Sequence, residues 1–423
     1  MCRRGVLVGL VAAGLAGCTG APPRQWDYVG KVPTDRIIDL DAAEDPTVPV
    51  VDLRLCERMA EGMHRADGPG RAGRPFNILA LSGGGAYGAY SAGVLVGWTE
   101  AGTRPEFDVV TGVSTGAIVA VCAFLGPDYD PGLRRFYTTV TNRDVYIKRN
   151  EIAGVLSDAL ADSRPLANMI AIVADEALLK KVAAEHAKGR RLYVGTTHLE
   201  TRRLVVWDMG AIASRGRSED LELFRKVLLA SASIPGFFPP VTLPVEVDGT
   251  GYGELHVDGG VTASLFFRPP RVPREQVASL GPDPLAGSNL YVIVAGKLFA
   301  DPGSVERKLL KIAEDSISAL LYAQTRGDLF QMFAVCLATK MNYNLTAVPA
   351  DAAAPADATS FDPVEMTALF EVGRKAAKEG DPWRHTPPGL QRGETAPPRA
   401  GTRFATRPAD GPPAVITVGG TRP

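Results

Sequence analysis

The sequence predicts an α/β fold with three layers, α/β/α, and a mainly parallel central sheet. Short apolar runs alternate with helical segments from about residue 76 onward, and the loops between them are short. Strand, helix, strand, helix in this order implies parallel pairing, with helices packed on the faces of the sheet.

The composition supports one large domain with attachments. The chain has 423 residues, 45% of them hydrophobic, so it can bury a substantial core and exceeds the usual length of a single domain. Its 46 Lys and Arg against 47 Asp and Glu give a formal net charge of −1, without the basic excess that nucleic-acid binding requires. No apolar run approaches the ~20 residues that cross a bilayer. We therefore expect that the protein has no nucleic-acid partner and is not a membrane protein with several spans.

The first four elements of the core follow from apolar runs and their glycine boundaries. Residues 76–81 are an apolar run that ends at Ser-Gly-Gly-Gly, which is typical of a buried strand before a tight turn. Residues 87–101 follow as a helix. Residues 107–111 form a second strand, closed by Gly112, and residues 117–125 form a second apolar helix.

The later elements carry weaker signals. Residues 191–198 and 204–208 alternate around a turn near Glu200, which predicts a hairpin at one side of the sheet. A last helix is predicted at residues 366–378, because Asp362 can cap it. The other predicted elements are strands at residues 255–257 and 289–298 and an amphipathic helix at residues 305–323.

The N-terminus resembles a bacterial lipoprotein signal. Arg3 and Arg4 precede an apolar run over residues 5–15, and a Leu-Ala-Gly-Cys tetrad ends at Cys18. This resemblance implies that residues 1–17 are removed and that Cys18 is lipidated. The protein would then be a lipid-anchored membrane lipoprotein of the bacterial cell envelope, on the periplasmic or outer-membrane side. The alternative is a generic signal peptide with a chance cysteine.

The rest of the chain divides into three parts. Residues 18–74 are rich in Pro, Gly, Asp and Arg and are predicted to be a tether and N-terminal extension, with a short helix near residues 53–64. Residues 75–380 are the predicted globular domain. Residues 381–423 are dominated by Pro, Gly, Arg and Thr, which predicts a disordered tail.

Residues 112–116, Gly-Val-Ser-Thr-Gly, are the sharpest motif. A serine between glycines at a strand-to-helix turn is a nucleophile elbow, because the sharp turn needs small neighbours and exposes the hydroxyl at the helix N-terminus. The alternative is that Ser114 only caps the helix. Its position between a predicted strand and a predicted helix is the context that the motif requires.

Residues 83–88, Gly-Gly-Gly-Ala-Tyr-Gly, admit two interpretations. They match the dinucleotide fingerprint, but that site needs an acidic residue at the carboxyl end of the second strand, and Asp108 lies at its start. A phosphate-binding P-loop would need Gly-Lys-Ser/Thr. A dinucleotide-dependent oxidoreductase is therefore disfavoured. Glycine N–H groups at a helix N-terminus can instead form an oxyanion hole.

Asp258 is the candidate base. It closes a short strand before a Gly-Gly turn, a pattern that is common and weak by itself. A Ser-His-Asp triad would need a histidine on Ser114, and His256 is the only serious candidate because it shares a strand face with Asp258. We prefer the simpler arrangement in which Asp258 itself accepts the Ser114 proton. The other histidines are His64, His186, His198 and His385.

The ordered motifs resemble those of patatin-like phospholipases. This chain has Gly-Gly-Gly-x-x-Gly, then Gly-x-Ser-x-Gly a short helix later, then Asp-Gly-Gly. Residues 162–166 (Asp-Ser-Arg-Pro-Leu) and 230–240 (Ala-Ser-Ala-Ser-Ile-Pro-Gly-Phe-Phe-Pro-Pro) match two further segments of the family. The likeness covers roughly residues 76–298, and the ordered set is more specific than any one motif.

This resemblance implies a patatin-like fold and lipid acyl hydrolase activity, with neither cofactor nor metal. It makes Ser114 the nucleophile and Asp258 its dyad partner, with an oxyanion hole at Gly83, Gly84 and Gly85. The other motif glycines are Gly88, Gly112, Gly116, Gly259 and Gly260. One departure is Tyr87, since the family often has Arg or Lys there, so no role for a cation beside the loop can be carried over.

The substrate that the resemblance implies is a lipid ester, reached at a membrane through the N-terminal anchor. No residue specifies its head group or the position that is cleaved. The alternative is a catalytically idle lipoprotein that uses the same fold to bind lipid or a partner. The intact Ser114 and Asp258 argue against that alternative.

Overall fold

The structure is a computed structural model that describes residues 36–38, 75–150, 157–247, 250–267, 285–301, 307–355, 357–390, 404–406 and 414–416. The predicted signal peptide, Cys18, the predicted helix at residues 53–64 and most of the predicted tail lie outside these residues. None of the helices in the described part combines the length and the hydropathy needed to span a bilayer.

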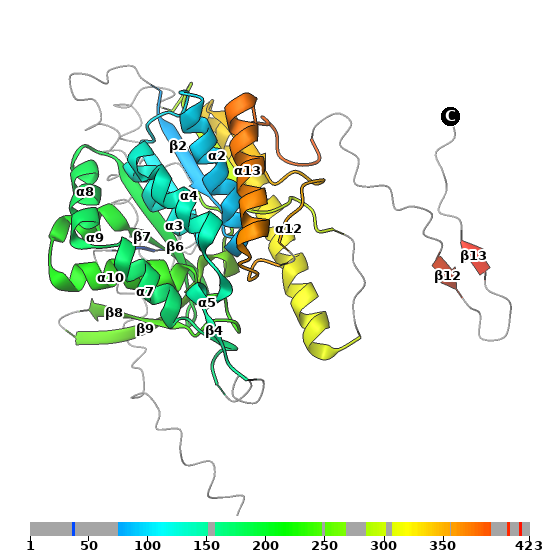
Figure 1. The fold of residues 1–423 in the computed structure, drawn as a ribbon, viewed down its shortest axis with the longest axis horizontal. Helices are drawn as coiled ribbons and strands as arrows, with labels where there is room; N and C mark the ends of the chain where they lie inside the picture. Colours follow the sequence, from blue (N-terminus) through cyan, green and yellow to red (C-terminus); the bar gives the residue numbers. More distant parts are fainter. Residues whose placement is uncertain are drawn as a thin grey trace, which may run out of the picture.

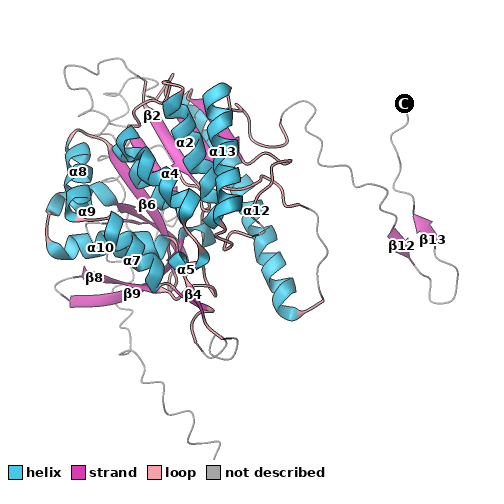
Figure 2. Ribbon diagram, in the orientation of Figure 1, coloured by secondary structure: helices cyan, strands magenta, loops and turns pink. Residues whose placement is uncertain are grey.

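A mixed sheet of nine strands forms the centre of the described structure (Figures 1 and 2). Its order is β1-β7-β6-β3-β2-β10-β11, with β9 also paired to β6 and β8 paired to β9. The five strands β2, β3, β6, β10 and β11 are parallel, and the others join antiparallel. The strands are β1 Arg36–Ile38, β2 Asn77–Leu81, β3 Val109–Val113, β6 Arg191–His198, β7 Arg203–Asp208, β8 Val241–Val247, β9 Thr250–Asp258, β10 Asn289–Val294 and β11 Asn342–Ala347.

Helices cover both faces of this sheet, as predicted. Figure 2 shows the strands behind a layer of helices that includes α2, α4 and α13. The helices are α2 Gly88–Glu100, α3 Thr115–Leu125, α4 Asp130–Thr139, α5 Asn142–Val145, α7 Arg164–Val173, α8 Glu176–Ala187, α9 Met209–Arg215, α10 Ser218–Ser231, α12 Leu309–Thr339 and α13 Pro363–Glu379. Short 3-10 turns are η3 Gly85–Tyr87, η4 Pro127–Tyr129 and η5 Gly259–Val261, and two small hairpins pair β4 Ile147–Lys148 with β5 Ala161–Asp162 and β12 Phe404–Thr406 with β13 Ala414–Ile416.

Two hydrophobic cores lie on opposite faces of the sheet. Along β2, Leu79 and Leu81 join the larger core beneath α2, α3 and α13, whereas Ile78 and Ala80 join the core beneath α12. The side chains alternate because successive strand residues point to opposite faces. Strands that are buried on both faces read as continuous apolar runs, which is why β2 could be predicted from its sequence.

Small residues let α2 and α13 pack closely. A side chain at Gly93 would collide with the carbonyl of Phe370, and one at Gly97 would collide with the carbonyl of Arg374. Two helices can come this near only where one of them has no side chains at the crossing. Asp362 caps α13 as predicted, because its carboxylate accepts the N–H groups of Val364 and Glu365.

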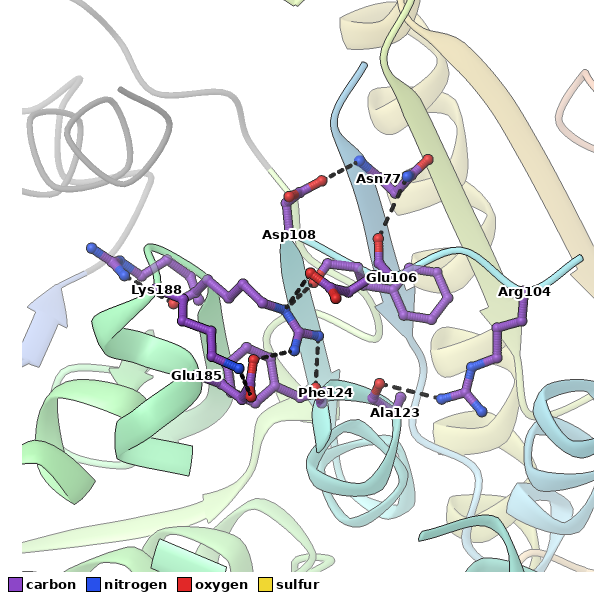
Figure 3. A network of polar contacts seen from close by, with 11 residues as sticks. Asn77, Arg104, Glu106, Asp108, Ala123, Phe124, Glu185 and Lys188 are labelled. Carbon is purple, nitrogen blue, oxygen red and sulfur yellow. Dashed lines mark hydrogen bonds and ion pairs between the residues drawn. The ribbon is translucent and has the colours of Figure 1, made fainter. Parts of the chain in front are cut away.

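A polar network ties the amino ends of the strands together (Figure 3). The Asp108 carboxylate accepts the N–H of Asn77 at 2.8 Å, so Asp108 joins β2 to β3 at their amino ends, at the opposite end of β3 from Ser114. At the end of α3, Arg104 donates to the carbonyl of Ala123 at 3.2 Å, and Arg190 donates to the carbonyl of Phe124 at 2.6 Å. Guanidinium groups at a helix C-terminus satisfy its last carbonyls and complement its dipole.

The helix α12 differs from the sequence prediction in length and in exposure. Among its described side chains the first buried one is Leu329, and the first half of the helix extends beyond the sheet (Figure 1). Its polar side is partly covered, because the side chains of Lys311, Asp315 and Tyr322 are half-buried. The apolar side faces outward, where exposures run from 40% to 82% at Leu309, Ile312, Ile317, Leu320 and Leu321.

The globular domain also extends past its predicted end at residue 380. The Trp383 ring lies 4.8 Å from Trp98 and 5.1 Å from Tyr291. Arg384 exchanges backbone hydrogen bonds of 2.8 Å with Leu345, at the end of the sheet. Trp98 and Tyr291 thus hold this segment against the domain, a long-range contact that its Pro-rich composition did not indicate.

Candidate active site

Ser114 lies at the sharp turn between β3 and α3. Its backbone has φ 56° and ψ −129°, a strained conformation for a residue with a side chain, and the residue is 5% exposed. The turn depends on Gly116, where a Cβ would lie 2.5 Å from the carbonyl oxygens of both Leu81 and Ser82. This is the geometry of a nucleophile elbow, which holds a hydroxyl at the start of a helix.

Ser231 holds the elbow from behind. The Ser114 N–H donates to Ser231 Oγ at 2.9 Å, and that hydroxyl donates to the carbonyl of Gly195 at 2.7 Å. Ser231 is fully buried at the end of α10. This role was not predicted from the sequence, although Ser231 stands in the Ala-Ser segment at residues 230–240, which carries part of the family resemblance.

The strand β6 brings Asp258 to Ser114. Along β6, Gly195 pairs with Val113 of β3, and the next residue, Thr196, pairs with Asp258 of β9. Because β9 takes the place beside β6 just where β3 ends, Asp258 arrives at the elbow. Its carboxyl lies near enough to the Ser114 side chain for that side chain to lower its pKa.

The environment of Asp258 makes it a stronger base than an exposed aspartate. Burial raises the pKa of its carboxyl from 3.8 to about 6, against hydrogen bonds from the Ser114 side chain and the Gly260 N–H that lower it. The Gly260 N–H donates to Asp258 Oδ1 at 2.7 Å and fixes the orientation of the carboxyl. Gly259 is needed because a Cβ there would lie 2.6 Å from the carbonyl of Gly195.

The glycine loop lies against the serine. A Cβ at Gly83 would be 3.0 Å from Ser114 Cβ and 3.8 Å from Ser114 Oγ. Gly84 has φ 157° and Gly85 has φ 54°, and a side chain at either would collide with the backbone carbonyl of Ala295 or Ala358. Among the described residues, the Ala86 N–H donates to the carbonyl of Ala358, and the Tyr87 N–H donates to the carbonyl of Gly84.

Tyr87 and Gly88 flank this loop. The Tyr87 hydroxyl donates to the carbonyl of Pro355 at 2.8 Å, and burial raises its pKa to about 12, so it is neutral. A Cβ at Gly88 would collide with the Thr115 hydroxyl and with Tyr137, and the hydroxyls of these two residues hydrogen-bond each other at 2.5 Å. The loop is thus locked to the start of α3 by neutral groups.

His256 lies in a different cluster from Ser114. Its Nδ1 is 2.9 Å from Thr196 Oγ1, and its Nε2 is 3.2 Å from Glu254 Oε2. Both ring nitrogens are therefore engaged away from the elbow, although His256 is only two residues from Asp258. The structure thus brings Ser114, Asp258 and the Gly83–85 loop together and does not place His256 among them.

Comparison with known proteins agrees with this geometry. A model of the patatin-like phospholipase family matches residues 79–270. Residues 79–270 form a patatin-like phospholipase domain. The match indicates lipid acyl hydrolase activity in general.

The matched segment of the patatin-like domain runs from β2 past Asp258, so it includes the whole elbow. Among solved structures, VipD from Legionella pneumophila is similar, at 12% sequence identity and a TM-score of 0.32. That alignment covers 72% of this chain and 67% of the VipD chain. No curated protein gives a match.

Proposed function

We propose that this protein is a serine lipid acyl hydrolase that cleaves carboxylic ester bonds of lipids, including phospholipids, through a Ser114–Asp258 dyad. The observation that carries the proposal is that β6 brings the buried Asp258 carboxyl to the strained Ser114, whose side chain lowers the pKa of that carboxyl. A nucleophile and a base within hydrogen-bond reach, both fixed by their backbones, are what covalent acyl transfer needs.

In the first half of the reaction, Asp258 accepts the Ser114 proton while the serine oxygen attacks the ester carbonyl. The resulting oxyanion is stabilised by N–H groups of the Gly83–85 loop, chiefly those of Gly84 and Gly85. Each such donor typically contributes about 10²–10³ to turnover. The tetrahedral intermediate then expels the alcohol, which takes the proton from Asp258, and leaves an acyl ester on Ser114.

In the second half, Asp258 takes a proton from water as that water attacks the acyl-serine. The same loop stabilises the second oxyanion, and collapse releases the carboxylic acid and restores the Ser114 hydroxyl. A pKa of about 6 suits this role, because the carboxylate is ionised at neutral pH and is still a stronger base than an exposed aspartate.

An apolar surface beside the site supports a lipid substrate. The first half of α12 presents Leu309, Ile317 and Leu320 outward. The same helix reaches the site, because its Asp328 carboxylate accepts the N–H groups of Ser264 and Leu265, just after the Asp258-Gly259-Gly260 turn. The helix that carries this exposed hydrocarbon is thus tied to the segment that follows Asp258, and an acyl chain or a lipid surface could bind to it.

Membrane attachment is part of the proposal and depends on the sequence alone. Cleavage after residue 17 and acylation of Cys18 would tether the domain through residues 18–74 to a membrane of the bacterial envelope. Mass spectrometry of the mature N-terminus tests this. An unmodified peptide that starts elsewhere would rule out the anchor.

The test of the activity is hydrolysis of a panel of phospholipid and neutral esters by the chain without residues 1–17. We expect release of fatty acid by the wild type, and none by Ser114→Ala with an unchanged circular dichroism spectrum. A folded wild-type protein that hydrolyses no ester and still binds lipid vesicles would favour the idle lipid-binding lipoprotein instead.

A further inference from the structure

Two short sequence patterns come together on one face of the β6–β9 pair. His198 is the last residue of β6 and Glu200 follows it in the turn to β7, while Glu254 and His256 stand two residues apart on β9. Residues two apart on a strand share a face, and the register pairs His198 with His256 directly. We propose that these four residues form a binding site for a divalent transition-metal ion of the zinc class.

The distances fit such an ion. Glu254 Oε2 lies 3.2 Å from His256 Nε2 and 3.9 Å from His198 Nε2, and the ligand atoms of these three residues are all within 4.8 Å of one another. Ligands bound to zinc at 2.0–2.2 Å in a tetrahedron lie about 3.3–3.6 Å apart. Small side-chain rotations would therefore place the three atoms on one ion.

Glu200 is the candidate fourth ligand, which would have to turn toward the ion, because the three mutually close ligand atoms belong to His198, Glu254 and His256. Its Oε2 lies 2.9 Å from His198 Nε2, and the Leu255 N–H donates to the same oxygen at 3.3 Å, which orients the carboxylate toward the cluster. Two imidazoles and two carboxylates are a donor set that zinc accepts, whereas calcium and magnesium prefer oxygen alone. Four protein ligands would close the coordination sphere, so the site would be structural.

Burial makes a cation favourable there. The Glu254 and His256 side chains are 0% exposed, His198 is 5% exposed and Glu200 is 10% exposed. Two carboxylates out of water carry two negative charges, which cost free energy unless they are compensated. A divalent cation compensates both, and it leaves the histidines neutral.

The outer contacts of the histidines suit metal binding through Nε2. His198 Nδ1 lies 2.8 Å from Thr201 Oγ1, and His256 Nδ1 lies 2.9 Å from Thr196 Oγ1. Each hydroxyl oxygen can accept an Nδ1–H, which leaves the Nε2 lone pair directed at Glu254. Such contacts fix the tautomer and the ring orientation of metal-bound histidines.

The site would brace the strand pairing that positions Asp258. Thr196, which contacts the His256 ring, is the register partner of Asp258. An ion at this cluster would hold β6 and β9 together two residues from the base, without contact with Ser114. The four residues are thus positioning residues, and their test depends on metal content and stability.

The experiment uses the purified untagged chain, stripped with a chelator and then titrated with Zn²⁺ alone. We expect uptake of about one equivalent per chain and a rise in the thermal midpoint, since an ion that binds only the folded state stabilises it. With Co²⁺ in place of Zn²⁺, we expect the visible absorption of a tetrahedral nitrogen–oxygen site.

Glu254→Gln and His256→Gln should each lower the zinc affinity about tenfold or more. The matched control is His186→Gln, because His186 is a half-buried histidine near another carboxylate, with Nδ1 3.6 Å from Asp208 Oδ1. The Ser114→Ala variant should bind zinc as the wild type does, so this test is independent of the proposed function. Wild-type protein that takes up neither zinc nor cobalt would overturn the proposal.

Discussion

The Asp258→Asn substitution is predicted to lower turnover severely and to stabilise the fold above pH 6. An amide of the same shape can still accept the Gly260 N–H, but it cannot take the Ser114 proton. Loss of a general base typically costs about 10²–10⁴ in turnover. Because the wild-type carboxyl has a pKa of about 6 when folded and 3.8 when unfolded, its ionisation opposes folding at neutral pH.

The size of this effect follows from the two pKa values. Their difference corresponds to about 3 kcal/mol at 1.36 kcal/mol per unit. Between pH 3.8 and about 6 the folded state binds more protons than the unfolded state, so wild-type stability falls as the pH rises through this window. The free energy of unfolding of Asp258→Asn, relative to wild type, should therefore increase by about 2.5 kcal/mol from pH 4 to pH 8.

The assay is urea unfolding of both proteins at a series of pH values. Packing effects of the substitution do not depend on pH and cancel from the trend. The wild-type kcat/KM should rise about tenfold per pH unit below 6 and level off above it. A stability difference that stays flat with pH, or an Asn variant that keeps turnover, would refute the assignment of Asp258 as a buried base.

Three further changes test the surroundings of the dyad. Ser231→Ala removes the acceptor of the Ser114 N–H, and should cost about 1–3 kcal/mol of stability and lower kcat. The control is Ser233→Ala, which loses only a hydrogen bond to the Leu229 carbonyl. Equal effects of the two substitutions would count against support of the elbow by Ser231. Gly84→Ala should collide with the Ala295 carbonyl and lower kcat by about 10²–10³, measured on a soluble ester, and normal turnover would mean that the loop is not the oxyanion hole. Leu320→Glu should reduce hydrolysis of vesicle lipid while the rate on a soluble short-chain ester is unchanged, whereas equal rates on both would remove α12 from the lipid surface.

Elements with local signals were predictable from the sequence. The strand at residues 191–198 was predicted with the bounds of β6, and the Asp362 cap correctly marked the start of α13. The elbow and the glycine loop followed from short motifs, because each depends on backbone space within a few residues. Parallel strands buried on both faces could be read from their apolar runs.

Features that depend on long-range register had no local signal, and the pairing of Asp258 with Ser114 was expected only through the family resemblance. Asp258 and Ser114 meet because adjacent residues of β6 pair with two different strands, and no local pattern encodes that pairing. Ser231 likewise reaches the elbow from the end of a helix that the sequence did not indicate. The pattern of α12 showed that it has an apolar side, but which side faces the protein depends on the tertiary structure.

Covalent labelling tests the central claim most directly. The chain without residues 1–17 is treated with a fluorophosphonate, and the modified peptide is identified by mass spectrometry. We expect one label per chain on Ser114, no label in Ser114→Ala, and much slower labelling in Asp258→Asn. A label on another residue, or equal labelling rates in the wild type and Asp258→Asn, would contradict the dyad.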